Sequence, residues 1–145
     1  MEESIVALMM ILGLGVADVV YFNSKTSGGY DALCYFIQPS TLTSDMEAYL
    51  KSPAWQKTVY WDSLLYQAAN HSLDLTISSL GPTRFSQELA KFQSLQKAIH
   101  ESCNGLEVFP CRSDGTKNLQ SDCLWNDSGC GRTCISEYLQ NHGYT

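Results

Sequence analysis

The chain has 145 residues, and its hydrophobic share of 44% supplies enough apolar material for one folded domain, which excludes a disordered chain. Its net charge is -6, and its nine lysine and arginine residues are scattered from Lys25 to Arg132 without a cluster. Because nucleic-acid binding needs a concentrated basic surface, we expect no nucleic-acid partner.

Residues 5–22 form the only long apolar run in the sequence. We expect a signal peptide over residues 1–17, with cleavage before Asp18 and a single disulfide-stabilised domain over 18–145. The acidic start of the chain departs from the basic start that is typical of such leaders. Two alternatives stay open for this run: a retained membrane anchor, for which its length just suffices, and a buried core helix or strand.

Six cysteines are present, and five of them lie within residues 103–134 among several glycines and a proline. They are Cys34, Cys103, Cys111, Cys123, Cys130 and Cys134. An even count in loop-like sequence predicts disulfide bonds and an oxidising compartment. The most economical pairing has one bridge that reaches Cys34 and keeps the others inside 103–134. No CxxC pair typical of structural zinc occurs, so we expect no metal and no cofactor.

Two acceptor sequences for N-glycosylation occur, at Asn70-His71-Ser72 and at Asn126-Asp127-Ser128. Together with the predicted leader and the cysteines they favour a secreted, extracellular glycoprotein. The alternative is a membrane-anchored protein with an extracellular domain, and it applies only if the N-terminal run is retained.

Helical signals dominate the middle of the chain. Ser44-Asp45-Met46-Glu47 matches a capping box, and Ser52-Pro53 pairs an N-cap serine with proline at the first helical position. Apolar residues then recur at intervals of three and four to about Asn70, and a further helix or a bent continuation follows. Gly81-Pro82 predicts its end.

The clearest helix is predicted from Pro82 to about Ser102. Phe85, Phe92 and Ile99 lie on one stripe of it, and Cys103 continues that stripe toward the core. A last helical turn or two is expected at 135–140.

Extended segments are expected at 18–23 and 32–37 on either side of Ser27-Gly28-Gly29, either as a hairpin or as two segments that pack separately on the core. The fold class is therefore mainly α: a three- or four-helix domain with a small extended N-terminal segment and a disulfide-stapled C-terminal loop region. The helical body covers about 40–103, and the cysteine-rich part covers 103–134.

Aromatic side chains are the candidate binding residues: Trp61 and Tyr66 on one predicted helix, Phe92 on the next, and Trp125 among the cysteines. An exposed aromatic surface favours a protein partner, and a cavity between the helices would instead carry a small apolar ligand. We therefore expect a protein-binding module that presents the loop 111–134, with an extracellular carrier as the alternative.

Catalytic motifs are absent from the sequence: it has no GxSxG elbow, HExxH helix, glycine-rich phosphate loop or EF-hand loop. We accordingly predict no catalytic residues and favour a role other than catalysis. A small secreted hydrolase with an acidic site stays as an alternative, because the chain holds 15 acidic residues.

Overall fold

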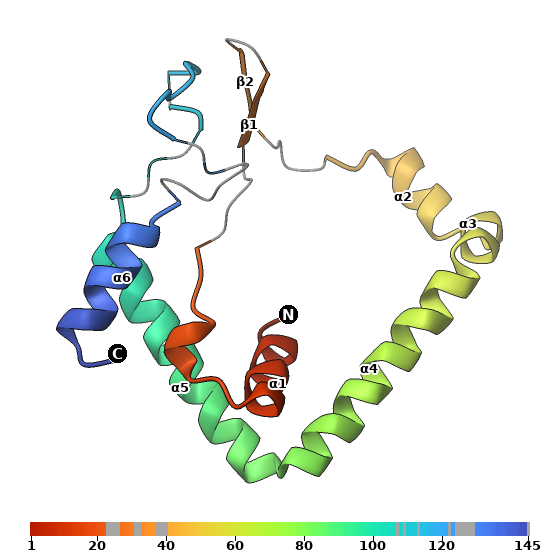
Figure 1. The fold of residues 1–145 in the computed structure, drawn as a ribbon. Coiled ribbons are helices and arrows are strands. Elements are labelled where there is room, and N and C mark those ends of the chain that lie inside the picture. The colour runs from red at the N-terminus through yellow and green to blue at the C-terminus, as the bar shows by residue number, and fades with distance from the viewer. Residues whose placement is uncertain are drawn as a thin grey trace.

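A computed structural model describes residues 1–22, 27–30, 33–36, 41–106, 108, 110–112, 114–121, 123 and 130–144. The chain is mainly helical, which confirms the predicted class. Its elements are α1 (Glu2–Leu12), the 3-10 helix η1 (Val16–Asp18), β1 (Ser27–Tyr30), β2 (Leu33–Phe36), α2 (Ser44–Leu50), α3 (Pro53–Thr58), α4 (Tyr60–Leu80), α5 (Pro82–Cys103) and α6 (Arg132–Asn141). Helices α4 and α5 form a V that meets at Gly81, and α1 lies between them (Figure 1).

Helix α5 is the central element, since α1, η1, α4 and α6 all pack against it. Proline at its first position has no amide to leave unpaired, so the helix starts directly after Gly81. The side chains that it buries lie on one stripe, in agreement with the sequence prediction; they are Phe85, Phe92, Leu95, Ile99 and Cys103.

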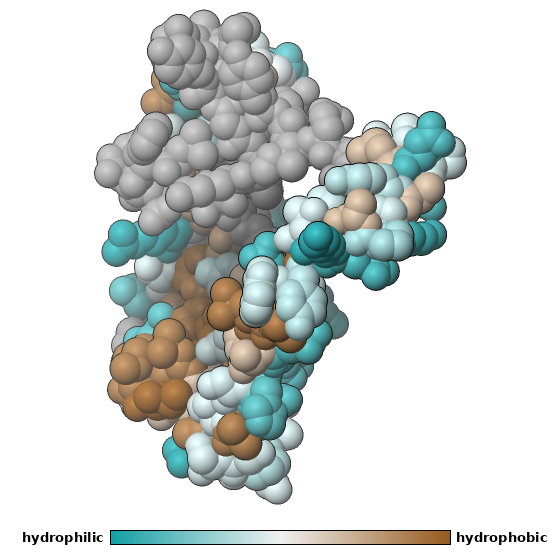
Figure 2. Space-filling view, turned by 90° about the vertical axis from the view of Figure 1, so that its right-hand side faces the viewer, coloured by the Kyte–Doolittle hydropathy of each residue, from teal (hydrophilic) through white to brown (hydrophobic). Residues whose placement is uncertain are grey.

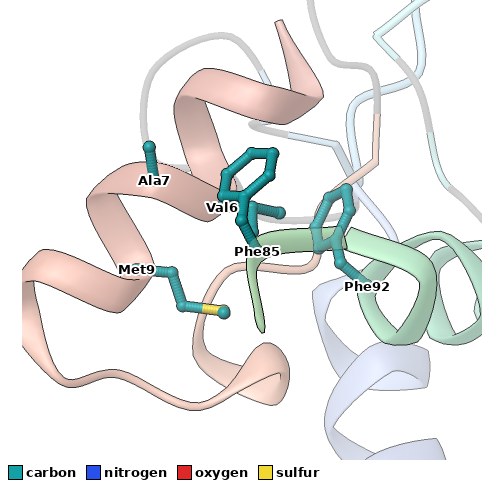
Figure 3. Close-up of a cluster of buried hydrophobic side chains, with 5 residues drawn as sticks. All are labelled: Val6, Ala7, Met9, Phe85 and Phe92. Atoms are coloured by element: carbon teal, nitrogen blue, oxygen red, sulfur yellow. The ribbon is translucent and has the colours of Figure 1, made fainter. Parts of the chain in front are cut away.

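The first core cluster joins α1 to the N-terminal half of α5. Val6 and Met9 reach from α1 toward Phe85 and Phe92 (Figure 3), and Val6 and Phe92 are completely buried. Apolar side chains near the end of α4 pack against the same cluster; they are Leu73, Ile77 and Leu80. The N-terminal apolar run therefore forms one wall of the core, while its cleavage before Asp18 stays a prediction.

Gln96 holds the segment after η1 against α5. Its side-chain amide donates to the carbonyl oxygen of Tyr21, and its side-chain oxygen accepts from the Tyr21 backbone amide at 3.2 Å. The His100 ring nitrogen Nε2 lies 3.3 Å from the same carbonyl oxygen, and the ring contacts Phe22. The contacts of His100 therefore serve packing and backbone satisfaction.

A hairpin is present, with β1 antiparallel to β2, but its first strand is not the predicted one. Ser27, Gly28 and Gly29 were expected in the turn and instead belong to β1. The segment expected to be extended at 18–23 forms no strand in its described residues 18–22: η1 ends at Asp18, whose carboxylate accepts a hydrogen bond from the Gly15 amide at 2.8 Å. A short polar side chain that bonds nearby backbone favours such a turn over a strand.

All six cysteines are paired: Cys34 with Cys111, Cys103 with Cys134, and Cys123 with Cys130. This is the predicted arrangement, with one bridge to Cys34 and two inside 103–134. The Cys103–Cys134 bridge joins the end of α5 to α6. A second core cluster surrounds it, in which Leu95, Ile99 and Cys103 are buried against Ile135, Tyr138 and Leu139.

A tight turn lies inside the cysteine-rich part at Asp114-Gly115. The Asp114 carboxylate accepts hydrogen bonds from the Thr116 hydroxyl at 2.6 Å and from the Thr116 amide at 2.9 Å. These hydrogen bonds lower the pKa of Asp114, because they favour its charged form. Gly115 has a φ of 83°, which glycine adopts without strain.

The buried position of Phe92 generates a stability prediction. Phe92→Ala should lower the free energy of unfolding by about 3–5 kcal/mol, since it opens a cavity between α1 and α5. Leu119→Ala is the matched control: Leu119 is 87% exposed, and the change should stay within about 0.5 kcal/mol. Chemical denaturation followed by circular dichroism measures both, and a similar small loss for the two variants would contradict the core position of Phe92.

The disulfides should differ in their contributions according to the loops that they close. Replacing Cys103 and Cys134 together by serine opens a bridge of sequence separation 31 and should cost about 3–4 kcal/mol. The same replacement at Cys123 and Cys130, separation 7, should cost about 2–2.5 kcal/mol. Denaturant unfolding under oxidising conditions checks the order, and a greater loss from the shorter loop would refute it.

Candidate interaction surface

Residues 44–72, which we name the arm, comprise α2, α3 and the first half of α4. The arm extends away from α1, α5 and α6 (Figure 1). None of the residues in α2, α3 or α4 is buried. The arm therefore keeps its shape through local helix signals, and its apolar side chains remain available to another molecule.

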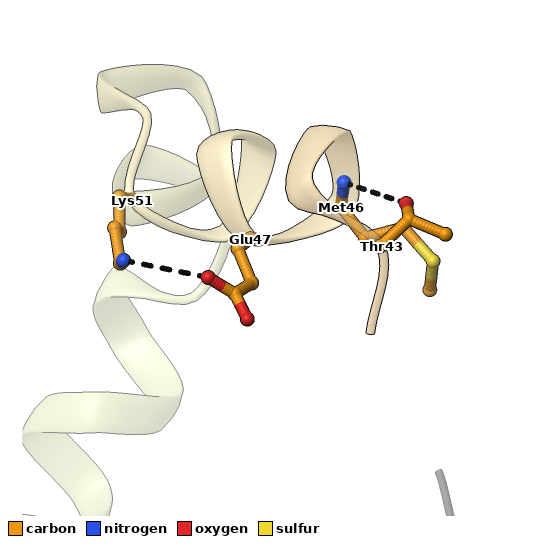
Figure 4. Close-up of polar contacts among 4 residues, drawn as sticks. All are labelled: Thr43, Met46, Glu47 and Lys51. Carbon is orange, nitrogen blue, oxygen red and sulfur yellow. Dashed lines mark hydrogen bonds and ion pairs between the residues drawn. The ribbon is translucent and has the colours of Figure 1, made fainter. Parts of the chain in front are cut away.

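Helix α2 begins with a side-chain cap at Thr43, whose hydroxyl oxygen accepts from the Met46 amide at 3.3 Å (Figure 4). The sequence prediction placed this cap one residue later, at Ser44. Thr43 has the extended backbone that an N-cap requires, so Ser44 becomes the first helical residue. An exposed ion pair of 3.8 Å between Glu47 and Lys51 spans the last turn.

Helix α3 begins as predicted, since the Ser52 hydroxyl oxygen accepts from the Trp55 amide at 3.2 Å and Pro53 occupies the first position. The helix was expected to continue to about Asn70, but it ends at Thr58, and α4 starts at Tyr60. The β-branched residues Thr58 and Val59 have low helix propensity, which accounts for a break at this point.

Large apolar side chains are exposed along the arm; we name Tyr49, Tyr60, Trp61, Leu65 and Tyr66 the apolar arm surface. Trp61 is 75% exposed, Leu65 70% and Tyr66 68%. Tyr60 and Trp61 meet edge to face, with their ring centroids 5.1 Å apart. Large apolar side chains exposed in such number on one short segment favour an interaction site.

A shallow groove of about 400 Å³ opens on α2. Leu42, Met46, Tyr49 and Leu50 form its apolar walls, and Asp45 lies at its edge. Tyr49 also contacts Trp55 of α3, with ring centroids 5.7 Å apart. The groove extends the apolar arm surface and gives it a depression in which a partner side chain can insert.

The four aromatic residues singled out from the sequence fall in different places. Trp61 and Tyr66 lie on the arm, whereas Phe92 lies in the core and is fully buried. Trp125 lies outside the described residues. The structure therefore does not bring Trp61 and Phe92 together around one cavity, which is the arrangement on which the carrier hypothesis was built.

Asn70, the first predicted glycosylation site, is exposed in the middle of α4. Asn126, the second, lies outside the described residues, as do residues 113, 122 and 124–129 of the loop 111–134 that was expected to meet a partner. The sequence analysis divided the apolar residues of α4 between a helix to about Asn70 and a further helix or bent continuation, and the structure has one helix over both. Of these residues only Leu73, Ile77 and Leu80 pack against the core.

A second apolar surface belongs to α1. Leu8, Ile11 and Leu12 are 55–60% exposed on the side that α5 does not cover. Figure 2 shows hydrophobic residues gathered over α1, at the lower left of the view. This helix is apolar on both its buried and its exposed sides, as a signal-peptide core and a buried helix both require.

An open groove of about 700 Å³ lies between α5 and α6. Leu95 and Tyr138 line it together with Tyr144, while Lys91 lies at its rim. Its volume is in the range of small-molecule sites, but its mixed polar and apolar walls are open to solvent.

Several ionisable groups of the described residues pair with side chains on their own helices. No group of three or more histidine, cysteine or acidic side chains in these ranges could hold a metal ion. Glu88 and Glu101 each face a lysine on their own helix, at 2.7 Å and 3.8 Å respectively. The His142 ring stacks on Tyr138.

Within the part of the chain that the structure describes, no helix combines the length and the hydropathy needed to cross a bilayer. Comparison with family models, curated proteins and solved structures finds no match for this chain. The functional argument therefore depends on the surfaces described above.

Proposed function

We propose that this chain is a protein-binding module and that the apolar arm surface is its binding site. One observation carries the proposal: α2, α3 and α4 contain no buried residue, yet they hold six large apolar side chains that are each more than half exposed, the five of the apolar arm surface and Leu75. Leaving these side chains in water costs free energy that a partner recovers by covering them.

The composition of the surface supports a protein partner over a small ligand. Tyrosine and tryptophan are the residues most enriched at the energetic centres of protein interfaces, where their large rings exclude water. Trp61 and Tyr66 are of this kind, and both are more than two thirds exposed on α4.

The proposed setting is extracellular. Three intramolecular disulfides are typical of secreted proteins, because reducing conditions in the cytosol disfavour them. The exposed Asn70 sequon supports the same setting and predicts a glycoprotein.

Removal of residues 1–17 as a signal peptide would add to the binding surface. Loss of α1 takes Val6, Ala7 and Met9 out of the core and uncovers Phe85 and Phe92 on α5. The mature protein would then carry a hydrophobic groove between α4 and α5, of the type that binds amphipathic helices.

Photo-cross-linking tests the binding site directly. The full chain, produced in secreting cells, carries a photoreactive phenylalanine analogue in place of Trp61 or, separately, of Leu65. We expect defined cross-links to a protein from both positions, because both side chains lie at the centre of the proposed interface. Mass spectrometry identifies the cross-linked species.

The same analogue at Glu137 is the matched control, since Glu137 is exposed on α6, away from the arm. It should give no such product. Arm-specific cross-links should also disappear when Leu65→Asp is added to the Trp61 probe, because Leu65 lies one turn from Trp61 on the same side of α4 and a charge desolvated in the interface is unfavourable. Equal products from Glu137 and Trp61, or none from the arm, would rule out this site.

Glycosylation at Asn70 is the second prediction. Protein collected from the medium of secreting cells should lose mass on glycosidase treatment. The Asn70→Gln variant should lose less mass, by the mass of one glycan. Ser72→Thr is the control, because it keeps the acceptor sequence and should keep the glycan. Intact mass also reports whether residues 1–17 are present. A glycosidase-sensitive mass loss in Asn70→Gln equal to that of the natural chain would contradict modification here.

A further inference from the structure

Helix α4 carries a second apolar stripe that the chain itself does not cover. Its members recur at alternating intervals of four and three residues, as in a coiled coil, and we name them the α4 seam: Trp61, Leu65, Ala68, Ser72 and Leu75. All five are exposed. Two of the large ones, Trp61 and Leu75, are 75% and 58% exposed.

The α4 seam is distinct from the side of α4 that faces the core. At about 100° per residue, Leu73, Ile77 and Leu80 lie roughly 120° round the helix from it. These three residues already pack against the first core cluster, so the body of the molecule occupies one side of α4 and leaves the seam clear. The helix thus has one face for its own chain and another for a partner.

The two ends of the seam lie at equal distances from Ala68. Trp61 lies seven residues before it and Leu75 seven residues after it, so two antiparallel copies crossing at Ala68 place Trp61 of each against Leu75 of the other. Leu65 lies three residues before Ala68 and Ser72 four residues after it, so these two come within one residue of facing each other, a large side chain near a small one. Ala68 meets its own copy, where a small side chain lets two helices approach closely.

The available area matches what a stable dimer needs. An aromatic side chain buries about 150–250 Å² when it is fully covered, so the five large exposed residues on this side of α4 offer on the order of 600 Å². They are Tyr60, Trp61, Leu64, Leu65 and Leu75. The smaller seam residues between them bring this close to the roughly 800 Å² per partner of a standard interface.

Neither a charged side chain nor the predicted glycan obstructs the α4 seam. None of its five positions carries a charge. Asn70 lies about 180° from the centre of the seam at 3.6 residues per turn, so a glycan there would point away from the second helix.

We propose that the partner of the arm is a second copy of this chain, and that the two α4 helices pair antiparallel through the α4 seam with Ala68 at the two-fold axis. The inference rests on the proposed function and names its partner. A two-fold contact of this kind uses one patch twice and closes on itself, so it produces a dimer and no larger assembly.

Sedimentation of the full oxidised chain over a concentration series tests the pairing. We expect a monomer–dimer equilibrium for the natural chain and at least about a 100-fold weaker Kd for Ala68→Glu, because two like charges then meet at the axis. Ser63→Glu is the matched control: it adds the same charge on the opposite, exposed side of α4 and should leave the Kd unchanged. Circular dichroism verifies that both variants keep their helices.

A charge-reversal experiment separates a symmetric contact from any other. Ala68→Lys should also be monomeric alone, and mixing it with Ala68→Glu should restore a dimer, since opposite charges then meet. A dimer insensitive to both changes overturns the inference, as does a mixture that stays monomeric. If the natural chain is monomeric while the Trp61 probe cross-links to a different protein, the inference fails and the proposed function stands. A monomer without arm cross-links removes both.

Discussion

Burial of one stripe of α5 is the constraint on which the rest of the described structure depends. In the first half of the helix, α1 and the end of α4 pack around Phe85 and Phe92. In the second half, α6 packs around Ile99 and Cys103. Each contributing element covers only a few of these side chains, so none has a core without α5. Loss of order in α5 would release both clusters together, which is the behaviour of a cooperative unit.

The disulfides restrain the parts of the chain that this stripe does not reach. The Cys34–Cys111 bridge closes a separation of 77 residues and ties the hairpin to the cysteine-rich part, a contribution of about 4.5 kcal/mol in the chain-entropy picture. Cys103 belongs to both systems, because it is fully buried on the α5 stripe and bonded to Cys134. Burial and covalent constraint thus meet at the end of α5, which fixes where α6 begins.

Sequence reasoning predicted the elements whose signals are local and failed where contacts with another element determine the structure. Pro82 and the Phe85–Ile99 spacing determined α5 without tertiary information, and Ser52-Pro53 determined the start of α3 in the same way. Gly28 and Gly29 were predicted in the turn of the hairpin, because glycine is uncommon inside strands. In the structure they belong to β1 and pair with β2, which only the tertiary structure reveals. The separation of Trp61 from Phe92 depends on the angle between α4 and α5, and the spacing of apolar residues in the sequence does not predict that angle.

Helix α4 illustrates a more general limit of sequence analysis. Regular apolar spacing indicates that one face of a helix is covered, but it does not identify the element or molecule that covers it. Leu73 and Leu75 have similar hydropathy and lie two residues apart, yet the first packs on the core and the second is 58% exposed. The same ambiguity affects α1, whose apolar character satisfies a leader and a core helix equally. The structure shows which apolar side chains the chain itself covers. For the exposed ones, a binding partner has to be inferred from the shape of the surface. For α4 the candidate occupant is a second copy of the same helix, because an antiparallel crossing at Ala68 sets the exposed Trp61 of each copy against the exposed Leu75 of the other.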